Sequence, residues 1–435
     1  MSALVTHRRQ INEVADVAVL PQPPRPTFFF FTFSTYGYGH VSRCHKIARD
    51  FVTRAPFDAH VISSHPDFQT GEENPRIHEV GLPPFVFGGS EPPSDYPCSL
   101  PGTPADVVET DLLHHKSRLL LALVGRLAPR GILIDHFPFP PQKASAECED
   151  TLAYLRRDSP ATLRCAGFRG VMPRPYGRED QRFIEQLLGD YVDLFFIYMD
   201  ESERKDFLAA YPFLGSLETR MRFVGYVCPP RTALAVQPGT MLATFGGGVD
   251  AYRKIHLVCE AFLTFADRHP GYAFQVVTGT RLPDGGYQEI VRRYDGRSGI
   301  RVTAFLPGLA ARLGSFELVL TMGGYNALTE LYQSSTRSVV LPRISPHHNE
   351  QLIQAQKFRR HGVVGPVVDA ATTTPEALAR VMEETLSAPR SVQRPLTDQG
   401  SRIVADLLRN ELSRREPSIA VANRPAAGGT PVATL

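Results

Sequence analysis

The stretch Leu318-Val319-Leu320-Thr321-Met322-Gly323-Gly324-Tyr325-Asn326-Ala327-Leu328-Thr329-Glu330 decides the fold. It passes from an apolar strand through two glycines into a helix, which is the repeating unit of parallel α/β sheets. The start of such a helix offers free N–H groups to a phosphate. Glu330 lies about two turns into the helix. A carboxylate there is placed to accept hydrogen bonds from both hydroxyls of a ribose, although most glutamates on helices simply face solvent.

The same unit recurs on both sides of a breaker-rich segment, and this repetition predicts two domains. Residues 27–34 form an apolar strand that leads through glycines into a helix over 41–53. After the proline-rich stretch 228–239, a second series begins with the strand 240–245. Two such series predict an α/β protein with two doubly wound, Rossmann-like domains, and ligands bind such sheets at the carboxyl ends of their strands. The cleft between the domains is therefore the expected site.

The expected domain boundaries follow from these breaks. The chain divides into a flexible N-terminal arm over 1–26, an N-terminal domain over 27–227, a linker over 228–239, a C-terminal domain over 240–395, a C-terminal helix over 396–415 and a disordered tail over 416–435.

Composition limits the class of protein. The 435 residues are 43% hydrophobic and carry a net charge of +2, which gives no field for binding nucleic acid. The longest apolar run near the start, 28–31, is far shorter than the roughly 20 residues of a membrane span, so we expect no transmembrane segment and leave peripheral membrane contact open. The six cysteines show no metal-type spacing and no secretory signal is visible, so a cytoplasmic protein without a metal or cofactor is expected.

A glycine loop near the N-terminus carries the first candidate for catalysis. In Tyr36-Gly37-Tyr38-Gly39-His40 the histidine falls at the start of a helix, where the helix dipole disfavours imidazolium and leaves a neutral imidazole that can act as a base. A helix-capping role would explain His40 equally well. Asp135, at the end of the strand 131–134, is a candidate to orient His40 or to bind an acceptor, and otherwise a polar turn residue.

Two further loops in the C-terminal half are candidates for ligand binding. Phe245-Gly246-Gly247-Gly248 joins a strand to a helix and is either a diphosphate cradle or a tight turn. The segment 342–351 follows the strand 338–341 and is crowded with polar groups, which suit the hydroxyls of a sugar or simply a solvated loop.

The order of these segments resembles the MurG-like glycosyltransferases of the GT-B fold, whose C-terminal domain is of the glycosyltransferase family 28 type. It is closer still to a subgroup of predicted bacterial glycosyltransferases, through 167–169, 223–227, 322–330 and 351–355. The resemblance covers roughly 27–368. The chain departs from the family at 248–250, Gly-Val-Asp, where a serine often follows the glycines, and at Glu350, where glutamine is common.

The resemblance implies roles for individual residues. It places His40 near the acceptor and the reacting carbon. Together with the strand-end position of Asp135, this leads us to expect catalysis by His40 and Asp135, and we expect acceptor binding at Tyr38, Arg43 and Arg169. The residues that it implies for the nucleotide-sugar donor are Gly246, Gly247, Gly248, Phe305, Leu306, Gly323, Gly324, Tyr325, Asn326, Glu330, His348, Asn349, Glu350 and Gln351.

The function expected from these residues is a sugar transfer with inversion, from a nucleotide diphosphate sugar, UDP-linked by family likeness, to a small-molecule acceptor such as a natural product. Helix dipoles stand in for a metal in this scheme. Two alternatives remain open. One is a nucleotide-sugar epimerase of the same fold, and the other is a protein that binds nucleotide sugars without turnover.

Overall fold

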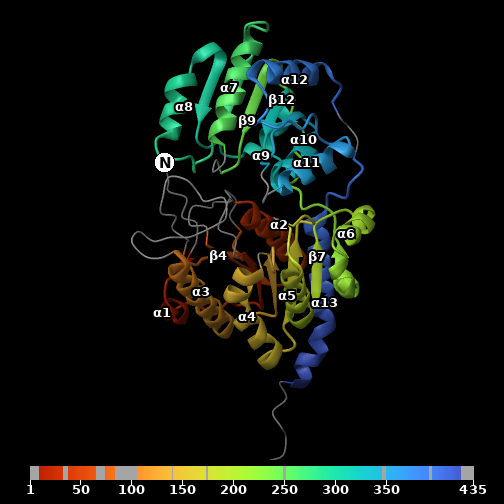
Figure 1. The fold of residues 1–435 in the computed structure, drawn as a ribbon. Helices are drawn as coiled ribbons and strands as arrows, with labels where there is room; N and C mark the ends of the chain where they lie inside the picture. The colour runs from red at the N-terminus through yellow and green to blue at the C-terminus, as the bar shows by residue number, and fades with distance from the viewer. Residues whose placement is uncertain are drawn as a thin grey trace, which may run out of the picture.

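The computed structural model describes residues 9–32, 38–64, 74–83, 105–139, 141–172, 175–247, 251–344, 349–390 and 394–422, with the side chains of 105–110, 143 and 416–422 left aside. Two α/β halves stand one above the other, and the last helix runs along the N-terminal half (Figure 1).

Within these residues the N-terminal half contains a parallel sheet of eight strands in the order β1-β4-β3-β2-β5-β6-β7-β8. The strands are β1 (Arg9–Gln10), β2 (Thr27–Thr32), β3 (Asp58–Ser63), β4 (Ile77–Gly81), β5 (Gly131–Asp135), β6 (Leu163–Phe168), β7 (Leu194–Ile197) and β8 (Met221–Phe223). Every residue of β2 is buried, which explains its continuous apolar run, because a central parallel strand is covered on both faces. The strand order reverses between β2 and β5, so the crevice of this sheet opens there.

Helices cover both faces of this sheet. They are α1 (Val14–Ala18), α2 (Gly39–Arg54), α3 (Ala105–Leu127), α4 (Pro141–Asp158), α5 (Arg178–Tyr191) and α6 (Arg204–Ala210), with the 3₁₀ turns η1 (Glu201–Glu203) and η2 (Pro212–Arg220). The helix that starts at Gly39 is the one expected over 41–53, and its buried face includes His40 and Arg43.

The C-terminal half holds a five-stranded parallel sheet in the order β11-β10-β9-β12-β13, counted over the described residues. Its strands are β9 (Thr240–Thr244), β10 (Ala273–Val277), β11 (Ile300–Thr303), β12 (Leu318–Thr321) and β13 (Arg337–Val340). The order reverses between β9 and β12, so their glycine turns lie side by side at the second crevice.

The remaining elements flank this sheet or lead out of it. They are α7 (Tyr252–Ala266), α8 (Gly286–Tyr294), α9 (Leu309–Arg312), α10 (Tyr325–Ser334), α11 (Glu350–Arg360), α12 (Pro375–Ser387) and α13 (Gly400–Ala422), with η3 (Arg297–Gly299) and η4 (Leu313–Ser315). Residues 228–239, the expected linker, form no helix or strand and separate β8 from β9.

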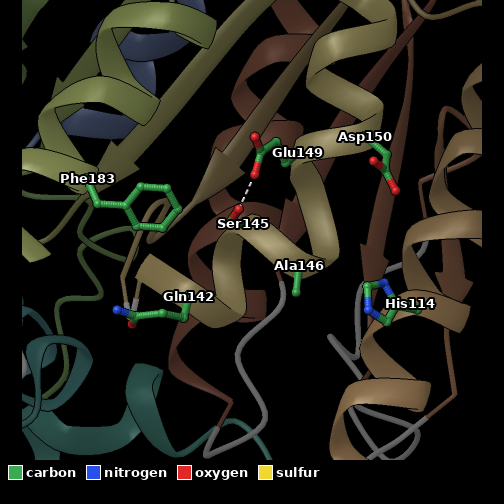
Figure 2. Close-up of a pocket in the computed structure, with 7 residues that line it drawn as sticks. All are labelled: His114, Gln142, Ser145, Ala146, Glu149, Asp150 and Phe183. Atoms are coloured by element: carbon green, nitrogen blue, oxygen red, sulfur yellow. Dashed lines mark hydrogen bonds between the residues drawn. The ribbon is translucent and has the colours of Figure 1, made fainter.

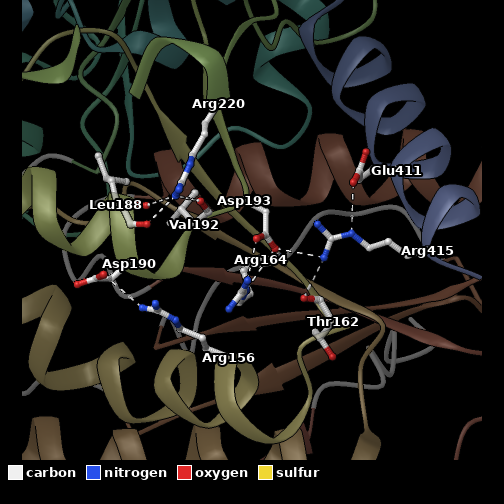
Figure 3. Close-up of polar contacts among 11 residues, drawn as sticks. Arg156, Thr162, Arg164, Leu188, Asp190, Val192, Asp193, Arg220, Glu411 and Arg415 are labelled. Atoms are coloured by element: carbon white, nitrogen blue, oxygen red, sulfur yellow. Dashed lines mark hydrogen bonds and ion pairs between the residues drawn. The ribbon is translucent and has the colours of Figure 1, made fainter. Parts of the chain in front are cut away.

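Helix α13 belongs spatially to the N-terminal half, where it packs on α2 (Figure 1). Arg415 pairs with Asp193 at 3.3 Å and donates a hydrogen bond to the Thr162 carbonyl, as Figure 3 shows. Ser401 donates a hydrogen bond to Asp50 of α2. The chain therefore crosses between the halves twice, once at 228–239 and once before α13.

The two ends of the chain differ from the expectation. Residues 9–26 were expected in a flexible arm, but β1 pairs with β4 and the side chains of Ile11, Val17 and Leu20 are buried against the sheet. The predicted tail over 416–435 is also wrong at its start, because α13 continues through Ala422. The buried apolar side chains hold residues 9–26 against the sheet, although the prolines of this segment had indicated a flexible arm.

One apolar cluster joins the two halves. It contains Phe28, Phe51 and Leu133 from the N-terminal half together with Leu328 and Phe358 from the C-terminal half. Five cysteines in the described part of the chain are buried and free, as expected for structural thiols. The interface between the halves is therefore built like a core.

Candidate functional site

His40 and Asp135 meet because they follow neighbouring strands at the first crevice. Strands β2 and β5 pair in register, with Thr32 opposite Asp135. Asp135 is the last residue of β5, and His40 is the second residue of α2, the helix that follows β2. The carboxyl ends of parallel strands share one edge of the sheet, so residues 95 positions apart come into contact.

The contact is a short hydrogen bond from the imidazole to the carboxylate. His40 Nδ1 lies 2.6 Å from Asp135 Oδ2, and both side chains are buried. Arg43 donates to the same carboxylate from Nε to Oδ1 at 2.9 Å and from Nη2 to Oδ2 at 2.6 Å. Arg43 Nη2 also lies 2.8 Å from His40 Nδ1. Because an ionised carboxylate is the stronger acceptor, we assign the Nδ1 proton to the bond with Asp135, which leaves Nε2 as the basic nitrogen.

The surroundings keep His40 neutral. Burial, with the positive charge of Arg169 as the next cause, lowers the pKa of His40 to about 4, although Asp135 acts in the opposite direction. Burial alone would raise the pKa of Asp135, but Arg43 and His40 hold it well below its ordinary value. At neutral pH the pair is therefore a neutral imidazole on an ionised carboxylate, the arrangement of a general base with its orienting acid.

Arg43 has a different position from the one expected for an acceptor ligand. Its side chain is 1% exposed and holds Asp135 with two hydrogen bonds. The guanidinium carbon lies 5.1 Å from the ring centroids of both Tyr198 and Tyr325. Arg43 thus has no free surface for an acceptor in this structure, and its contacts fix the carboxylate that orients His40.

The physical reason for a glycine differs from position to position in the two turns of the C-terminal half. A Cβ on Gly323 would lie 2.7 Å from the Gln351 carbonyl and 3.0 Å from the Ala355 Cβ, so glycine is required there by packing against α11. Among the residues that the structure describes, a Cβ on Gly324 would meet nothing within 4 Å, and its φ of −68° suits any residue. Gly246 has a φ of +62°, which favours glycine. Gly247 has no such need, and of the described atoms a Cβ there would meet only Arg281 Cδ, at 4.0 Å. The open space at Gly247 and Gly324 is what close approach by a ligand requires.

The first turn of α10 contacts the N-terminal half. The Tyr325 hydroxyl accepts from the Val227 amide at 2.9 Å, and its side chain is buried. Asn326 Nδ2 donates to the Gly39 carbonyl at 3.1 Å. Both residues had been assigned to the donor, but these contacts use them to hold the starts of α2 and α10 together. The positive ends of two helices are thereby brought to one place.

Glu330 lies further along α10 and faces a cation that the sequence analysis had missed. Burial raises the pKa of Glu330, and Lys46 of α2 opposes that shift. Lys46 Nζ is buried and makes no hydrogen bond within the described part of the chain. Lys46 falls one turn after Arg43, but a lysine within an amphipathic helix carries no signal that distinguishes it from a solvent-facing residue.

Arg169 and Glu350 join the two halves directly. Arg169 Nη2 lies 2.9 Å from Glu350 Oε2, and Gln354 Nε2 donates to the Arg169 carbonyl at 3.0 Å. Arg169 had been expected at the acceptor and Glu350 at the donor sugar, and the structure places these two side chains in direct contact. Gln351 Oε1 accepts from the Arg343 amide at 2.8 Å, and Asn349 precedes α11 as its N-cap residue.

The other expected donor residues are dispersed around the same edge. Phe305 is 67% exposed on the loop after β11, an unusual position for a phenylalanine, and Leu306 packs beside the core. Tyr38, which was expected at the acceptor, is the N-cap residue of α2. Gly248 and His348 lie outside the described residues.

A hollow of about 360 Å³ lies on the N-terminal half, between α3, α4 and α5. Figure 2 shows the Phe183 ring directed toward Ser145 and Glu149, with His114 and Asp150 on the other side. Ser145 donates to Glu149, and Gln142 donates to Asp180 at 2.6 Å. These polar groups are already paired, so we assign no ligand to this hollow.

Among the described residues, no group of three or more His, Cys, Asp or Glu side chains is arranged to hold a metal ion. The helices described are all too short or too polar to cross a bilayer.

The two facing parallel sheets, with crevices that meet at the starts of α2 and α10, are the GT-B fold. Residues 241–407 match the family model for the glycosyltransferase family 28 C-terminal domain. The expected resemblance of the C-terminal half to this family is therefore confirmed.

Solved structures extend the likeness to most of the chain. A glycosyltransferase of kitacinnamycin is 16% identical with a TM-score of 0.53, covering 92% of this chain and 98% of its own. The UDP-GlcNAc 2-epimerase of Methanocaldococcus jannaschii, solved with UDP-GlcNAc and UDP, is 11% identical with a TM-score of 0.55, covering 88% and 99%. MurG of Acinetobacter baumannii is 12% identical with a TM-score of 0.51, covering 88% and 100%. A comparison with curated protein sequences gives no significant match. At these identities the structures establish the fold alone.

Proposed function

We propose that the protein transfers a sugar, with inversion, from a nucleotide diphosphate sugar to a hydroxyl or other nucleophile of a small-molecule acceptor. The observation that carries the proposal is the His40–Asp135 hydrogen bond next to the turn that opens α10. A general base is needed in an inverting transfer to remove the acceptor proton, and a donor turn within reach supplies the second reactant.

The donor half of the proposal rests on the open turns. The backbone at Gly247 and Gly324 leaves room for a diphosphate, and the starts of α2 and α10 direct their positive ends to the same place. In the reaction, His40 Nε2 takes the proton from the acceptor, the acceptor oxygen attacks the anomeric carbon, and the diphosphate leaves. Helix dipoles stabilise the charge that develops on the leaving group, without a metal ion in this scheme.

The nucleotide and the acceptor are proposed from the similar structures. Several of these were solved with UDP or a UDP-sugar bound, which favours a UDP-linked donor. Others are glycosyltransferases of kitacinnamycin and calicheamicin, which favours a natural-product acceptor held by the N-terminal half.

The test measures release of nucleoside diphosphate from a panel of nucleotide sugars, with and without an acceptor panel. We expect acceptor-dependent release by the wild type and a loss of roughly 10²- to 10⁴-fold in His40→Ala, the usual contribution of a general base. Asp135→Asn, which keeps the shape of the orienting side chain, should lower turnover in the same direction.

The same assay separates the alternatives. An epimerase of this fold would convert the donor with no acceptor present, and a binding protein would bind donor without turnover. Wild-type turnover in His40→Ala would remove the base from the mechanism.

A further inference from the structure

Arg281 lies beside the glycine turn that follows β9, at the second crevice. It belongs to no sequence motif that had indicated a functional role. It follows β10, the strand that pairs with β9 on the side away from β12. Its amide donates to the Gly247 carbonyl at 2.9 Å, and its Cδ lies 4.0 Å from where a Cβ on Gly247 would be. The loop after β10 is thus fixed against the turn after β9.

The guanidinium of Arg281 rests on an aromatic ring from the other half of the protein. Its carbon lies 4.9 Å from the centroid of the Tyr38 ring, a cation–π distance. Tyr38 directly precedes Gly39 and His40 at the start of α2. The side chain of Arg281 therefore bridges the turn of the C-terminal half and the helix that carries His40.

The charge of Arg281 has no anionic partner among the described residues. The other arginines of the site are engaged, since Arg43 holds Asp135 and Arg169 holds Glu350. Arg281 makes no ion pair with a described carboxylate, and it is half-buried beside a turn where two glycines leave open space. A half-buried cation of this kind, beside a glycine turn with open space, is suited to an anion that arrives with a ligand.

We propose that Arg281 binds the diphosphate of the nucleotide-sugar donor, with Tyr38 as the residue that positions its guanidinium. The inference rests on the proposed function and adds a residue to it. A planar guanidinium contacts two phosphate oxygens at once, and in the transition state it compensates the charge that builds on the leaving diphosphate. Because Tyr38 belongs to the N-terminal half, the cation is in place only when the two halves are together.

The experiment is calorimetric titration of the full chain with UDP, dTDP and GDP, followed by the nucleoside of whichever diphosphate binds most tightly. Arg281→Gln should weaken binding of the diphosphate about tenfold or more, as expected for a lost charged hydrogen bond, and leave the nucleoside unchanged. Arg292→Gln on α8 is the matched control, since Arg292 is exposed and outside the site, and its affinities should equal those of the wild type.

Two Tyr38 variants test the positioning role. Tyr38→Phe keeps the aromatic face and should retain the affinity for the diphosphate, whereas Tyr38→Ala should lower it. A thermal melt of each variant excludes unfolding as the cause.

The outcomes distinguish this inference from the proposed function. Equal diphosphate affinity in Arg281→Gln and the wild type overturns the role of Arg281 and leaves the transferase proposal standing. Weakened binding in the variant, together with a wild type that shows no acceptor-dependent turnover, supports the role of Arg281 and removes the transfer chemistry. A wild type that binds none of the three diphosphates and no inorganic pyrophosphate removes both.

Discussion

A proton acceptor must be neutral before it acts, and the residues around His40 produce that state. Burial and Arg169 lower the pKa of His40 to about 4, while Asp135 holds Nδ1 and leaves Nε2 unprotonated. A base with so low a pKa is weak, and its strength improves as its pKa approaches the working pH. A bound diphosphate supplies negative charge that opposes the effect of Arg169, so donor binding should raise the pKa of His40.

The pH dependence of kcat/KM should therefore differ from that of kcat. kcat/KM reports the free enzyme and should stay level from neutral pH until it falls near pH 4, as His40 becomes protonated. kcat reports the substrate complex, and its acid limb should lie at higher pH because the diphosphate raises the pKa of His40. Steady-state rates measured across this range check both limbs.

The variant Arg169→Gln tests whether the positive charge of Arg169 lowers the pKa of His40. Removal of its positive charge should raise the pKa of His40 in the free enzyme and move the acid limb of kcat/KM upward, toward the ordinary histidine value. An acid limb of kcat/KM near pH 6.5 in the wild type would contradict the account, because it would mean that His40 is not buried among cations in the free enzyme.

The contact between His40 and Asp135 could be anticipated from the sequence, whereas their catalytic role stays a prediction. His40 and Asp135 were marked because each follows an apolar strand, and parallel strands bring such residues to one edge. Arg43 was expected at the acceptor, and Tyr325 and Asn326 at the donor, yet their side chains make contacts within the protein. Lys46 and Arg281 were missed because their importance comes from contacts across the two halves, which local pattern does not record.

At the scale of elements, the turn between β12 and α10 contains one glycine that packs against the protein and one that leaves space for a ligand. Its two glycines are adjacent in sequence, but only Gly323 is enclosed, by Gln351 and Ala355 of α11. The sequence predicted the strand, the turn and the helix over nearly the observed residues, because apolar runs and glycines define them locally. It did not predict which glycine packs against the protein, since α11 arrives from later in the chain.

A pair of alanine variants tests this distinction. Gly323→Ala should destabilise the fold, because its Cβ would lie 2.7 Å from the Gln351 carbonyl. Gly324→Ala should fold with nearly wild-type stability and bind nucleoside diphosphate more weakly, because its Cβ enters the space proposed for the phosphate. Thermal melts and titrations with UDP measure the two effects.

The opposite pattern would contradict the proposed donor site. If Gly324→Ala bound the diphosphate as tightly as the wild type, the open space at the start of α10 would have no part in binding. If both variants lost stability equally, the packing account of Gly323 alone would be wrong.

For the whole molecule, the core that joins the halves has a thermodynamic consequence. Interfaces between domains of one chain usually allow independent motion, unless they are large and apolar. Here one buried cluster contains residues of both halves, and α13 returns from the C-terminal half to pack on α2. The sequence predicted the two series of strands and helices, but not this return, because a terminal amphipathic helix does not reveal which domain it covers.

We therefore expect the two halves to unfold together. Differential scanning calorimetry of the full chain should show a single transition, and a saturating nucleotide should raise its midpoint because it binds only the folded state. Two well-separated transitions, of which only the later one responds to nucleotide, would show that the apolar cluster does not couple the halves.

The most direct test of the central claim is a crystal structure of the protein with a bound nucleoside diphosphate. The account predicts the diphosphate against the backbone of Gly247 and Gly324, with the Arg281 guanidinium on its oxygens and His40 facing the end of the diphosphate to which the sugar of the donor would be attached. A nucleotide bound away from these turns, for example in the hollow beside α4, would contradict it.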